Sequence, residues 1–305
     1  MENMEQKILI IDKDQTSNEH LRGFLHPRYE VTVAPMLQEA MDQLTEKPYD
    51  LVLGDFEIFQ NFGDNLPDEI RKHQSQVKIA LLSGVDAEFY IDYLLVWQCF
   101  HVLPKLPFYN ARDVLLFIEN ILDPMNAFGL PRYLSMDAEW SSKRITSRQD
   151  KNRSVEEIIN FFAGCEYEIH ELYDVRLIME EIINNAIFHA FVDKDAKPRY
   201  RSDYFDSLKD DEEVWLAFGS DATTIGFSVT DNRGLLTPEI ILRKLSRQYN
   251  REGLYDESGR GLYLARNLSG NMIFNIEKGR RTQIVTLFYE KRINIPTPLS
   301  INYIE

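Results

Sequence analysis

The sequence contains little cysteine and no long hydrophobic runs. Cys99 and Cys165 are the two cysteines, and each lies in an apolar segment. Two isolated cysteines cannot build a disulfide framework, and no cysteine–histidine cluster indicates a zinc site, so we expect reduced thiols in a cytoplasmic protein. No apolar run approaches the roughly 18–20 residues that a membrane span needs. The polar residues 1–7 contain no signal-peptide core.

Positive charge is also scarce. The chain has 34 Lys and Arg against 49 Asp and Glu, a formal net charge of −15. Such a surface repels nucleic-acid phosphates and anionic lipids, so we expect neither nucleic acid nor a membrane as a partner. The short basic run 143–153 is mixed with Asp and Ser, and we interpret it as a solvated strand edge or turn. A protein partner, or a nucleotide held through Mg²⁺, remains compatible with this charge.

The length and the apolar content favour two domains. The chain has 305 residues, of which 44% are hydrophobic. In the first half, short apolar runs typical of buried strands alternate with helical patterns. The expected strands are 7–11, 29–33, 51–54, 77–82 and 100–103, and the expected helices include 37–45, 66–73, 88–97 and 110–122. This order predicts an α/β domain over residues 1–123, with a five-stranded parallel doubly wound sheet.

The second half has a different pattern. Residues 124–135 hold two prolines and a glycine and predict a linker. For residues 136–295 we expect an α+β two-layer sandwich, and for 296–305 a C-terminal tail. The expected helices are 154–163, capped by Ser154, then 175–191, 237–249 and 261–268; the expected strands are 213–219, 224–230, 271–276 and 283–289.

Polar residues follow the predicted strands of the first domain where those strands end. They are Asp12, Asp14, Asp55, Ser83 and Lys105. Because an open parallel sheet places its site beyond the carboxyl ends of its strands, we expect these groups on one rim. The set suits phosphoryl chemistry: Asp55 as the nucleophile, Asp12 as a Mg²⁺ ligand, and Ser83 and Lys105 against the phosphoryl oxygens.

This pattern resembles the receiver domain of response regulators over about residues 5–123. The resemblance implies that Asp55 accepts a phosphoryl group from an upstream histidine kinase, with Mg²⁺ held by Asp12 and Asp55. Two positions depart from the family. Lys13 stands where a second acid usually binds the metal, so its ammonium could pair with the carboxylates instead, leaving Asp14 as a substitute ligand. Phe59 stands in place of a common proline. The alternative is a pseudo-receiver that serves only as a docking or dimer surface.

In the second domain, the predicted helix 175–191 is apolar except for one polar row. Glu181, Asn185 and His189 are spaced i, i+4, i+8 and share a face. Polar groups on a buried helix need partners, whereas on a surface helix they would face solvent. Both interpretations stay open at this point.

Downstream segments supply groups suited to a nucleotide. Asp231 ends a predicted strand, and its carboxylate can accept a hydrogen bond from the adenine amino group; Gly234 follows it. The sequence Gly259-Arg260-Gly261 opens a predicted helix. Glycines there allow backbone N–H groups to approach phosphate, and a helix N-terminus favours an anion.

The order of these elements over about residues 136–292 resembles the GHKL ATPases, whose two-layer domain is of the Bergerat type. The sequence 259–268 is most similar to the second glycine box of the anti-sigma-factor serine kinases. The resemblance implies ATP and Mg²⁺ as cofactors, Asn185 as the Mg²⁺ ligand and Glu181 as the general base. It places further residues at the nucleotide: His189, Asp231, Gly234, Gly259, Arg260, Gly261 and Thr282. One departure is the first glycine box, which keeps a single, shifted glycine, Gly234.

These resemblances predict a two-component signalling regulator. Its receiver would control an ATP-dependent serine kinase that acts on a sigma factor or an anti-anti-sigma protein. A non-catalytic ATP-binding or pseudo-receiver partner-switching adaptor is the alternative. Histidine-kinase-like phosphotransfer is disfavoured, because residues 124–153 are too short and too broken for the required helical hairpin. A homodimer through either domain is compatible with the sequence.

Overall fold

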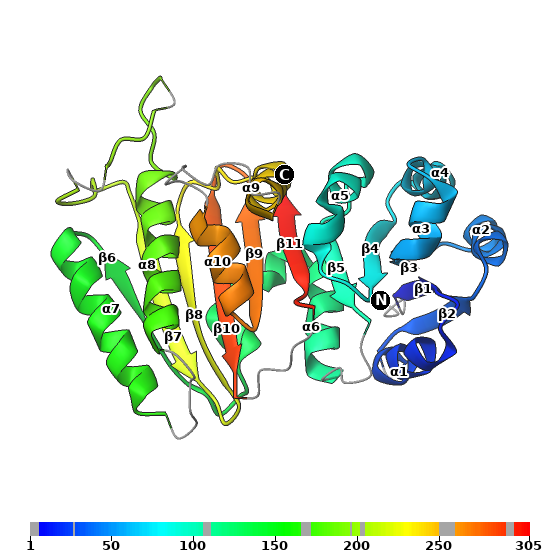
Figure 1. Cartoon of the computed structure of the whole chain (residues 1–305), viewed down its shortest axis with the longest axis horizontal. Coiled ribbons are helices and arrows are strands. Elements are labelled where there is room, and N and C mark those ends of the chain that lie inside the picture. Colours follow the sequence, from blue (N-terminus) through cyan, green and yellow to red (C-terminus); the bar gives the residue numbers. More distant parts are fainter. Residues whose placement is uncertain are drawn as a thin grey trace, which may run out of the picture. The chain divides into compact units, whose positions relative to one another are not determined.

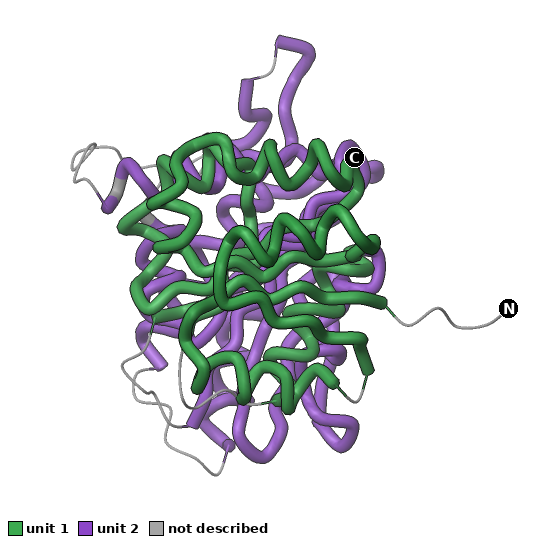
Figure 2. Tube along the Cα trace, turned by 90° about the vertical axis from the view of Figure 1, so that its right-hand side faces the viewer, with its two compact units in different colours: residues 1–124, 295–300 green, residues 125–294, 301–305 purple. Residues whose placement is uncertain are grey.

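The structure is a computed structural model that describes residues 6–26, 28–105, 111–165, 172–195, 197–201, 205–249, 260–290 and 296–305. It divides into two compact units (Figure 2). Unit 1 comprises Met1–Pro124 and Ile295–Ser300, and unit 2 comprises Met125–Asn294 and Ile301–Glu305. Among the helices of the described residues, none has the length and apolar character needed to cross a membrane.

Unit 1 contains the expected parallel sheet, in the order β2-β1-β3-β4-β5. Its strands are β1 (Lys7–Ile11), β2 (Glu30–Ala34), β3 (Leu51–Asp55), β4 (Lys78–Ser83) and β5 (His101–Pro104). Its helices are α1 (Gln15–Leu25), α2 (Leu37–Glu46), α3 (Phe56–Phe62), α4 (Leu66–His73), the 3₁₀ turn η1 (Ala87–Tyr90), α5 (Ile91–Trp97) and α6 (Ala111–Leu122). The central strands β3 and β4 are almost entirely buried and mostly apolar, as expected for a parallel sheet with both faces covered (Figure 1).

Two acids of the rim also begin helices of unit 1. Asp14 caps α1 by accepting a hydrogen bond from the backbone N–H of Ser17. Asp55 caps α3 in the same way through the N–H of Ile58. The C-terminal segment, which we expected to be a tail, contains strand β11 (Leu299–Ile304), and its residue Leu299 pairs antiparallel with Val102 of β5.

Unit 2 contains an antiparallel sheet in the order β9-β10-β8-β7-β6, with helices packed on it (Figure 1). Its strands are β6 (Glu139–Ile145), β7 (Val214–Ser220), β8 (Thr224–Asp231), β9 (Asn271–Glu277) and β10 (Arg281–Tyr289). Its helices are α7 (Arg148–Ala163), α8 (Leu172–Phe188), α9 (Pro238–Tyr249) and α10 (Arg260–Leu268). This mixed α+β arrangement agrees with the sequence-based prediction.

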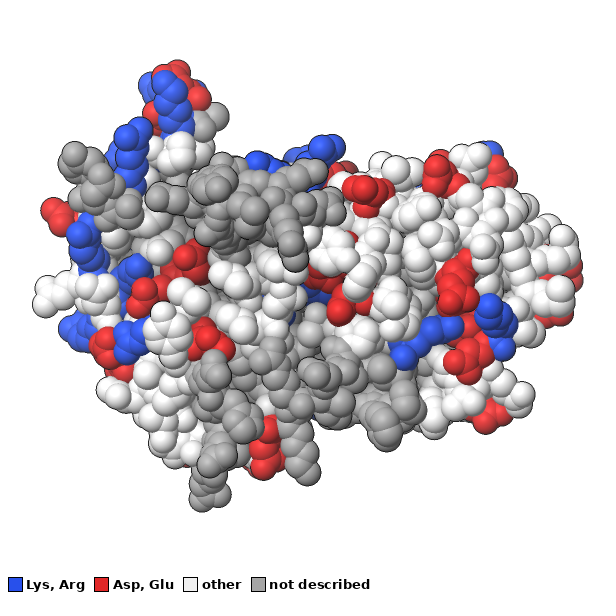
Figure 3. Space-filling view, in the orientation of Figure 1, with Lys and Arg blue, Asp and Glu red and all other residues white. Residues whose placement is uncertain are grey.

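The start of α7 corrects one prediction. The helix begins at Arg148 and is capped by Ser147, which accepts a hydrogen bond from the N–H of Asp150 at 3.1 Å. Ser154 is buried within the helix and caps nothing. The basic run 143–153 therefore spans the end of β6 and the first turns of α7. Its charges are balanced locally, as in the Lys143–Glu157 ion pair, and Figure 3 shows basic and acidic side chains next to one another in this part of the surface.

The segment that we expected to be a linker packs within unit 2. It forms the 3₁₀ turns η2 (Pro124–Ala127) and η3 (Leu130–Tyr133). The backbone N–H of Gly129 donates to the side chain of Gln283 at 2.8 Å, and Leu130 contacts Gly226 of β8. Because neighbouring residues of a strand point to opposite faces, Asp231 of β8 lies on the face away from this segment. Helix α8 packs against β8 and β7.

Candidate functional sites

The rim of unit 1 brings three of the predicted residues into direct contact. Nζ of Lys105 donates to Oδ1 of Asp12 at 2.7 Å and to Oδ2 of Asp55 at 2.6 Å. The two carboxylates are almost completely buried, and the lysine is largely so. The ammonium therefore neutralises two acids that would otherwise repel one another in a poorly solvated site.

Burial shifts the pKa of two members of this triad, Asp12 and Lys105. It raises the pKa of Asp12, although the hydrogen bond from Lys105 opposes the shift. Burial also lowers the pKa of Lys105, but its hydrogen bonds to Asp12 and Asp55 outweigh that effect and leave the pKa raised. Lys105 is therefore charged at neutral pH.

Ser83 and Asp14 lie at the same rim but are engaged elsewhere. The hydroxyl of Ser83 donates to the carbonyl of Val85 at 2.9 Å, and the N–H of Lys105 donates to the carbonyl of Ser83 at 2.6 Å. Asp14 caps α1, and its N–H donates to Oδ1 of Asp12 at 3.0 Å. Both residues therefore support the geometry around Asp12 and Lys105.

Lys13 does not take the place that we considered for it. Its ammonium pairs with Glu57 at 3.1 Å, and both side chains are 66% exposed. The cation between the two buried carboxylates is Lys105, because Lys13 points from the end of β1 toward solvent. The departure from the receiver pattern at this position thus leaves Asp12 and Asp55 free of a second lysine.

The rim fits a divalent cation in part. Oδ2 of Asp12 is buried and has no hydrogen-bond partner among the described residues, as expected of an oxygen that could bind a cation. Asp55 lies beside it through their shared contact with Lys105. Within the described ranges, no group of three or more His, Cys, Asp or Glu side chains is placed to hold a metal. A cation here would therefore rely on these two carboxylates.

Phe59, at the position where receivers often have proline, is accommodated by a glycine. A Cβ on Gly54 would lie 2.0 Å from the ring of Phe59. The ring is fully buried and packs edge-on against Trp97, at 5.9 Å between centroids. Phe56, the residue after Asp55, stacks on Tyr90 at 3.9 Å. An aromatic cluster thus supports the start of α3 directly behind Asp55.

In unit 2, α8 and α10 bring the predicted base and the second glycine box together. A Cβ on Gly261 would lie 2.2 Å from Oε2 of Glu181. Glu181 makes no hydrogen bond or ion pair among the residues that the structure describes, and burial raises its pKa against the opposing charge of Lys151. A partly buried carboxylate with a raised pKa and no partner is suited to accept a proton.

Asn185 and His189 follow Glu181 toward the C-terminal end of α8. Asn185 lies one turn after Glu181, and its side chain likewise makes no hydrogen bond within the described part of the chain. His189 lies just beyond the last residue of α8, where its N–H donates to the carbonyl of Asn185 at 3.0 Å. Lys244 of α9 lies near His189, whose pKa is lowered by desolvation and by this positive charge. Unpaired amide oxygen and carboxylate groups on one helix face are suitable ligands for a Mg²⁺-bound phosphate chain.

Asp231 and Thr282 form the other part of the site, on neighbouring strands. They lie directly opposite each other in the β8–β10 pairing. Oδ1 of Asp231 accepts hydrogen bonds from the backbone N–H groups of Arg233 at 2.9 Å and Gly234 at 3.2 Å. Burial raises the pKa of Asp231 to about 6, against these two amides. The buried hydroxyl of Thr282 lies close enough to the Asp231 carboxylate to oppose this rise as well.

Gly234 occupies a position that requires glycine. Its φ of +61° is unfavourable for other residues, and a Cβ there would lie 2.1 Å from the carbonyl oxygen of Glu277. Gly259 and the side chain of Arg260 lie outside the described residues, so the predicted phosphate contacts are represented by the start of α10 and by Gly261. A buried hydroxyl beside a buried carboxylate, and a glycine packed against Glu181, fit a bound nucleotide.

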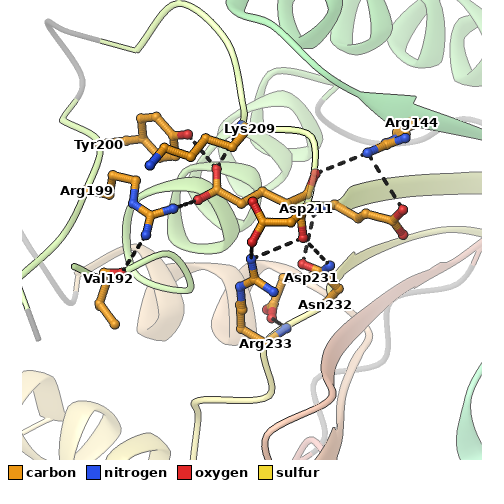
Figure 4. A network of polar contacts seen from close by, with 11 residues as sticks. Arg144, Val192, Arg199, Tyr200, Lys209, Asp211, Asp231, Asn232 and Arg233 are labelled. Atoms are coloured by element: carbon orange, nitrogen blue, oxygen red, sulfur yellow. Dashed lines mark hydrogen bonds and ion pairs between the residues drawn. The ribbon is translucent and has the colours of Figure 1, made fainter. Parts of the chain in front are cut away.

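The structure also reveals contacts that the sequence did not predict. The acidic run Asp211, Glu212 and Glu213 would be expected in solvent, yet Glu212 is completely buried. Its carboxylate accepts hydrogen bonds from Arg199, from the hydroxyl of Tyr200 and from the backbone N–H of Lys209 (Figure 4). The only sign of this in the sequence was the upstream pair Arg199 and Tyr200, whose contact with Glu212 depends on the tertiary structure.

Comparison with known proteins associates each unit with a family. Residues 8–112 match the response regulator receiver domain, and residues 148–287 match the histidine kinase-like ATPase domain. Among solved structures, a two-component response regulator from Clostridium difficile is 26% identical, with 40% of this chain and 99% of that chain covered and a TM-score of 0.35. A CheY-like response regulator receiver domain protein from Methanospirillum hungatei JF-1 is 23% identical, with 41% and 99% covered and a TM-score of 0.36. No curated protein matches the chain.

Proposed function

We propose that this chain, in which a response regulator receiver domain precedes a histidine kinase-like ATPase domain, is a signalling regulator whose receiver controls an ATP-dependent protein serine kinase. The observation that carries the proposal is the close approach of Gly261 to the carboxylate of Glu181, which has no hydrogen-bond partner among the described residues. It brings a candidate general base to the start of α10, the helix that contains most of the second glycine box. The substrate class is a protein serine, on a sigma factor or an anti-anti-sigma protein.

Each group of unit 2 has a role in this chemistry. Bound ATP supplies the phosphoryl group, and Mg²⁺ neutralises its charge. Asp231 accepts a hydrogen bond from the adenine amino group, with Thr282 beside it. Asn185 would hold the cation, and the backbone N–H groups at the start of α10 would donate to the phosphates, a role that the resemblance implies for Gly259, Arg260 and Gly261. Glu181 would take the proton from the serine hydroxyl as that oxygen bonds to the γ-phosphorus of ATP and the bond from this phosphorus to the departing ADP breaks.

The receiver supplies the input. Asp55 accepts a phosphoryl group from an upstream histidine kinase, and Lys105, which already contacts the Asp55 carboxylate, remains with a phosphoryl oxygen. Asp12 contributes the orphaned oxygen for a cation. Phosphorylation would insert a phosphoryl group between Asp55 and Lys105, so that the direct hydrogen bond from Lys105 to Asp55 is replaced by one to a phosphoryl oxygen. The position of Lys105 at the end of β5 would then change.

The decisive experiment is a phosphorylation assay. The full chain is incubated with radiolabelled Mg–ATP and a panel of sigma factors and anti-anti-sigma proteins, with and without acetyl phosphate as phosphodonor for Asp55. We expect phosphoserine on a partner, its loss in Glu181→Gln, and a rate that acetyl phosphate changes in wild type but not in Asp55→Asn. Absence of phosphoserine on every partner, with Glu181→Gln indistinguishable from wild type, would refute the kinase.

An adaptor is the second candidate, favoured by one observation. The first glycine box has Arg233 where a glycine is usual, and Arg233 and its neighbour Asn232 make fixed contacts, which suits a site that holds nucleotide without turnover. In that case ATP binds and changes partner affinity, but no phosphoserine forms. Measuring binding and phosphate release in the same samples separates the two candidates.

A further inference from the structure

The altered first glycine box makes contacts that glycines cannot make. Asn232 and Glu213 are joined twice: the N–H of Asn232 donates to the carbonyl of Glu213 at 3.2 Å, and the N–H of Glu213 donates to Oδ1 of Asn232 at 3.0 Å. The side-chain amide of Asn232 also donates to the carbonyl of Asp211 at 2.9 Å. Asn232 therefore links the turn after β8 to the residues that precede β7 by hydrogen bonds.

Arg233 reinforces the same connection. Its guanidinium donates to the carboxylate of Asp211 at 2.7 Å and to the carbonyl of Asp211 at 3.1 Å (Figure 4). It also lies 5.4 Å from the ring centroid of Phe191. Phe191 and Asp211 lie at the two ends of the α8–β7 connection, which we define as residues 189–213. Arg233 thus holds both ends of this connection against the turn that begins with Asp231.

The α8–β7 connection has its own internal anchor. The buried carboxylate of Glu212 receives the guanidinium of Arg199, the hydroxyl of Tyr200 at 2.5 Å and the backbone N–H of Lys209 at 3.0 Å. Arg199 also donates to the carbonyl of Val192 at 3.2 Å. Because these bonds join residues 192, 199 and 200 to residues 209 and 212, a displacement of Asp211 is transmitted to these described parts of the connection.

The turn held by Asn232 and Arg233 is also the one that positions Asp231. The backbone N–H groups of Arg233 and Gly234 donate to Oδ1 of Asp231. The α8–β7 connection begins directly after α8, the helix that carries Glu181 and Asn185. It therefore joins the catalytic helix to the base-binding turn through Arg233, which stands where the box usually has a glycine, and through its neighbour Asn232.

We propose that Asn232 and Arg233 are positioning residues that couple the α8–β7 connection to the base-binding end of the nucleotide site. This inference rests on the proposed ATP binding. Occupation of the site tightens the connection, and loosening the connection weakens nucleotide binding by the same factor, because coupling between two equilibria is reciprocal. In this proposal, the turn with the shifted glycine links nucleotide binding to the conformation of the α8–β7 connection.

The test measures hydrogen–deuterium exchange and nucleotide affinity on the full chain. In ligand-free protein, we expect Arg233→Ala to speed exchange of the amides of residues 206–213 about tenfold, and to weaken Mg–ATP binding about tenfold, as expected for losing a charged hydrogen bond. Arg233→Lys should restore part of both effects. Arg153→Ala is the matched control, because it removes another surface Arg–Asp pair and should change neither measurement.

Asp211→Asn provides a second, milder variant, since its side chain is 71% exposed and the turn itself is untouched. Asp211→Asn should speed amide exchange and weaken Mg–ATP binding in the same direction as Arg233→Ala. Asp211→Glu, which keeps the carboxylate, should have exchange rates and an affinity close to those of wild type. Unchanged exchange and affinity in both Arg233→Ala and Asp211→Asn would overturn the proposal. A wild-type chain that binds no ATP would instead refute the proposed function, while the ligand-free exchange data would still decide whether Arg233 anchors the connection.

Discussion

Gly261 and Glu181 touch so closely that a methyl group on the glycine would come within 2.2 Å of the glutamate Oε2. The obstructing atoms belong to the end of a movable side chain, so Gly261→Ala should remain folded and displace the carboxylate. We expect serine phosphorylation, or ATP hydrolysis, to fall about 10²-fold, the lower end of the contribution of a general base. Leu264→Ala, on an exposed position of the same helix, is the control. Equal activities of the two variants would show that Glu181 is not positioned by this contact.

Gly54 should be intolerant of a side chain for a different reason. Its hypothetical Cβ lies 2.0 Å from the buried ring of Phe59, which cannot move without disturbing its contact with Trp97. Gly54→Ala should therefore lower the free energy of unfolding by about 1–3 kcal/mol. Gly23→Ala, in α1 with nothing within 4 Å, should instead stabilise by about 0.5–1 kcal/mol. Calorimetric unfolding of the full chain measures both, and a Gly54→Ala transition like that of wild type would contradict the packing.

Nucleotide binding should depend on the ionisation of Asp231. Burial raises the pKa of this carboxyl to about 6. In the ionised form, neither oxygen carries a proton, so either oxygen can accept the hydrogen bond from the adenine amino group. Affinity for Mg–ATP should therefore fall about tenfold when the pH is lowered one unit below this pKa. Asp231→Asn should bind more weakly at pH 7.5 but lack this inflection, so the comparison removes the titration of the nucleotide phosphates. A parallel pH profile in the two proteins would refute the assignment.

The same shift has a consequence for stability without nucleotide. Because burial raises the pKa of Asp231 in the folded protein above its ordinary value, this group's contribution to the free energy of unfolding is full below that ordinary value and is lost as the pH rises through about 6. Unfolding of ligand-free Asp231→Asn should therefore lack this loss of stability between pH 4 and pH 7.

Lys105 should be essential to the stability of unit 1 in a pH-dependent way. Lys105→Met leaves Asp12 and Asp55 buried beside one another, which should cost about 3–5 kcal/mol at pH 7.5. Since burial already raises the pKa of Asp12 and Lys105 opposes that shift, the variant should bind a proton there and recover stability as the pH falls. Lys105→Arg, which keeps the positive charge, should lower the free energy of unfolding by less than Lys105→Met. A loss in Lys105→Met that is equal at pH 5 and pH 7.5 would contradict this account.

Much of the receiver rim could be predicted because strand ends are local features of the sequence. Apolar runs located β1, β3 and β5, and the residues after them, Asp12, Asp55 and Lys105, meet as expected. The direction of Lys13 could not be predicted, because its partner Glu57 is 44 residues away in the chain. Helix α3 was also missed, since it begins immediately after β3 without an intervening loop.

In unit 2, the predictable features were again those with a strong periodic pattern. The row Glu181–Asn185 on α8 and the strand ending at Asp231 were both visible in the sequence. Strand β6 was not, because it is an edge strand whose residues are mostly exposed and polar. The anchoring role of Asp211 and Glu212 was hidden for the opposite reason: an acidic run appears solvated until its partners, which lie elsewhere in the chain, are placed beside it.

Calorimetric titration of the full chain with Mg–ATP tests the central claim most directly. We predict saturable binding of one ATP per chain, weakened at least tenfold by Asn185→Ala and by Asp231→Asn. GTP should bind at least tenfold more weakly than ATP, because guanine presents a carbonyl oxygen where adenine presents its amino group to Asp231. Absence of saturable ATP binding, or binding that neither variant weakens, would contradict the account.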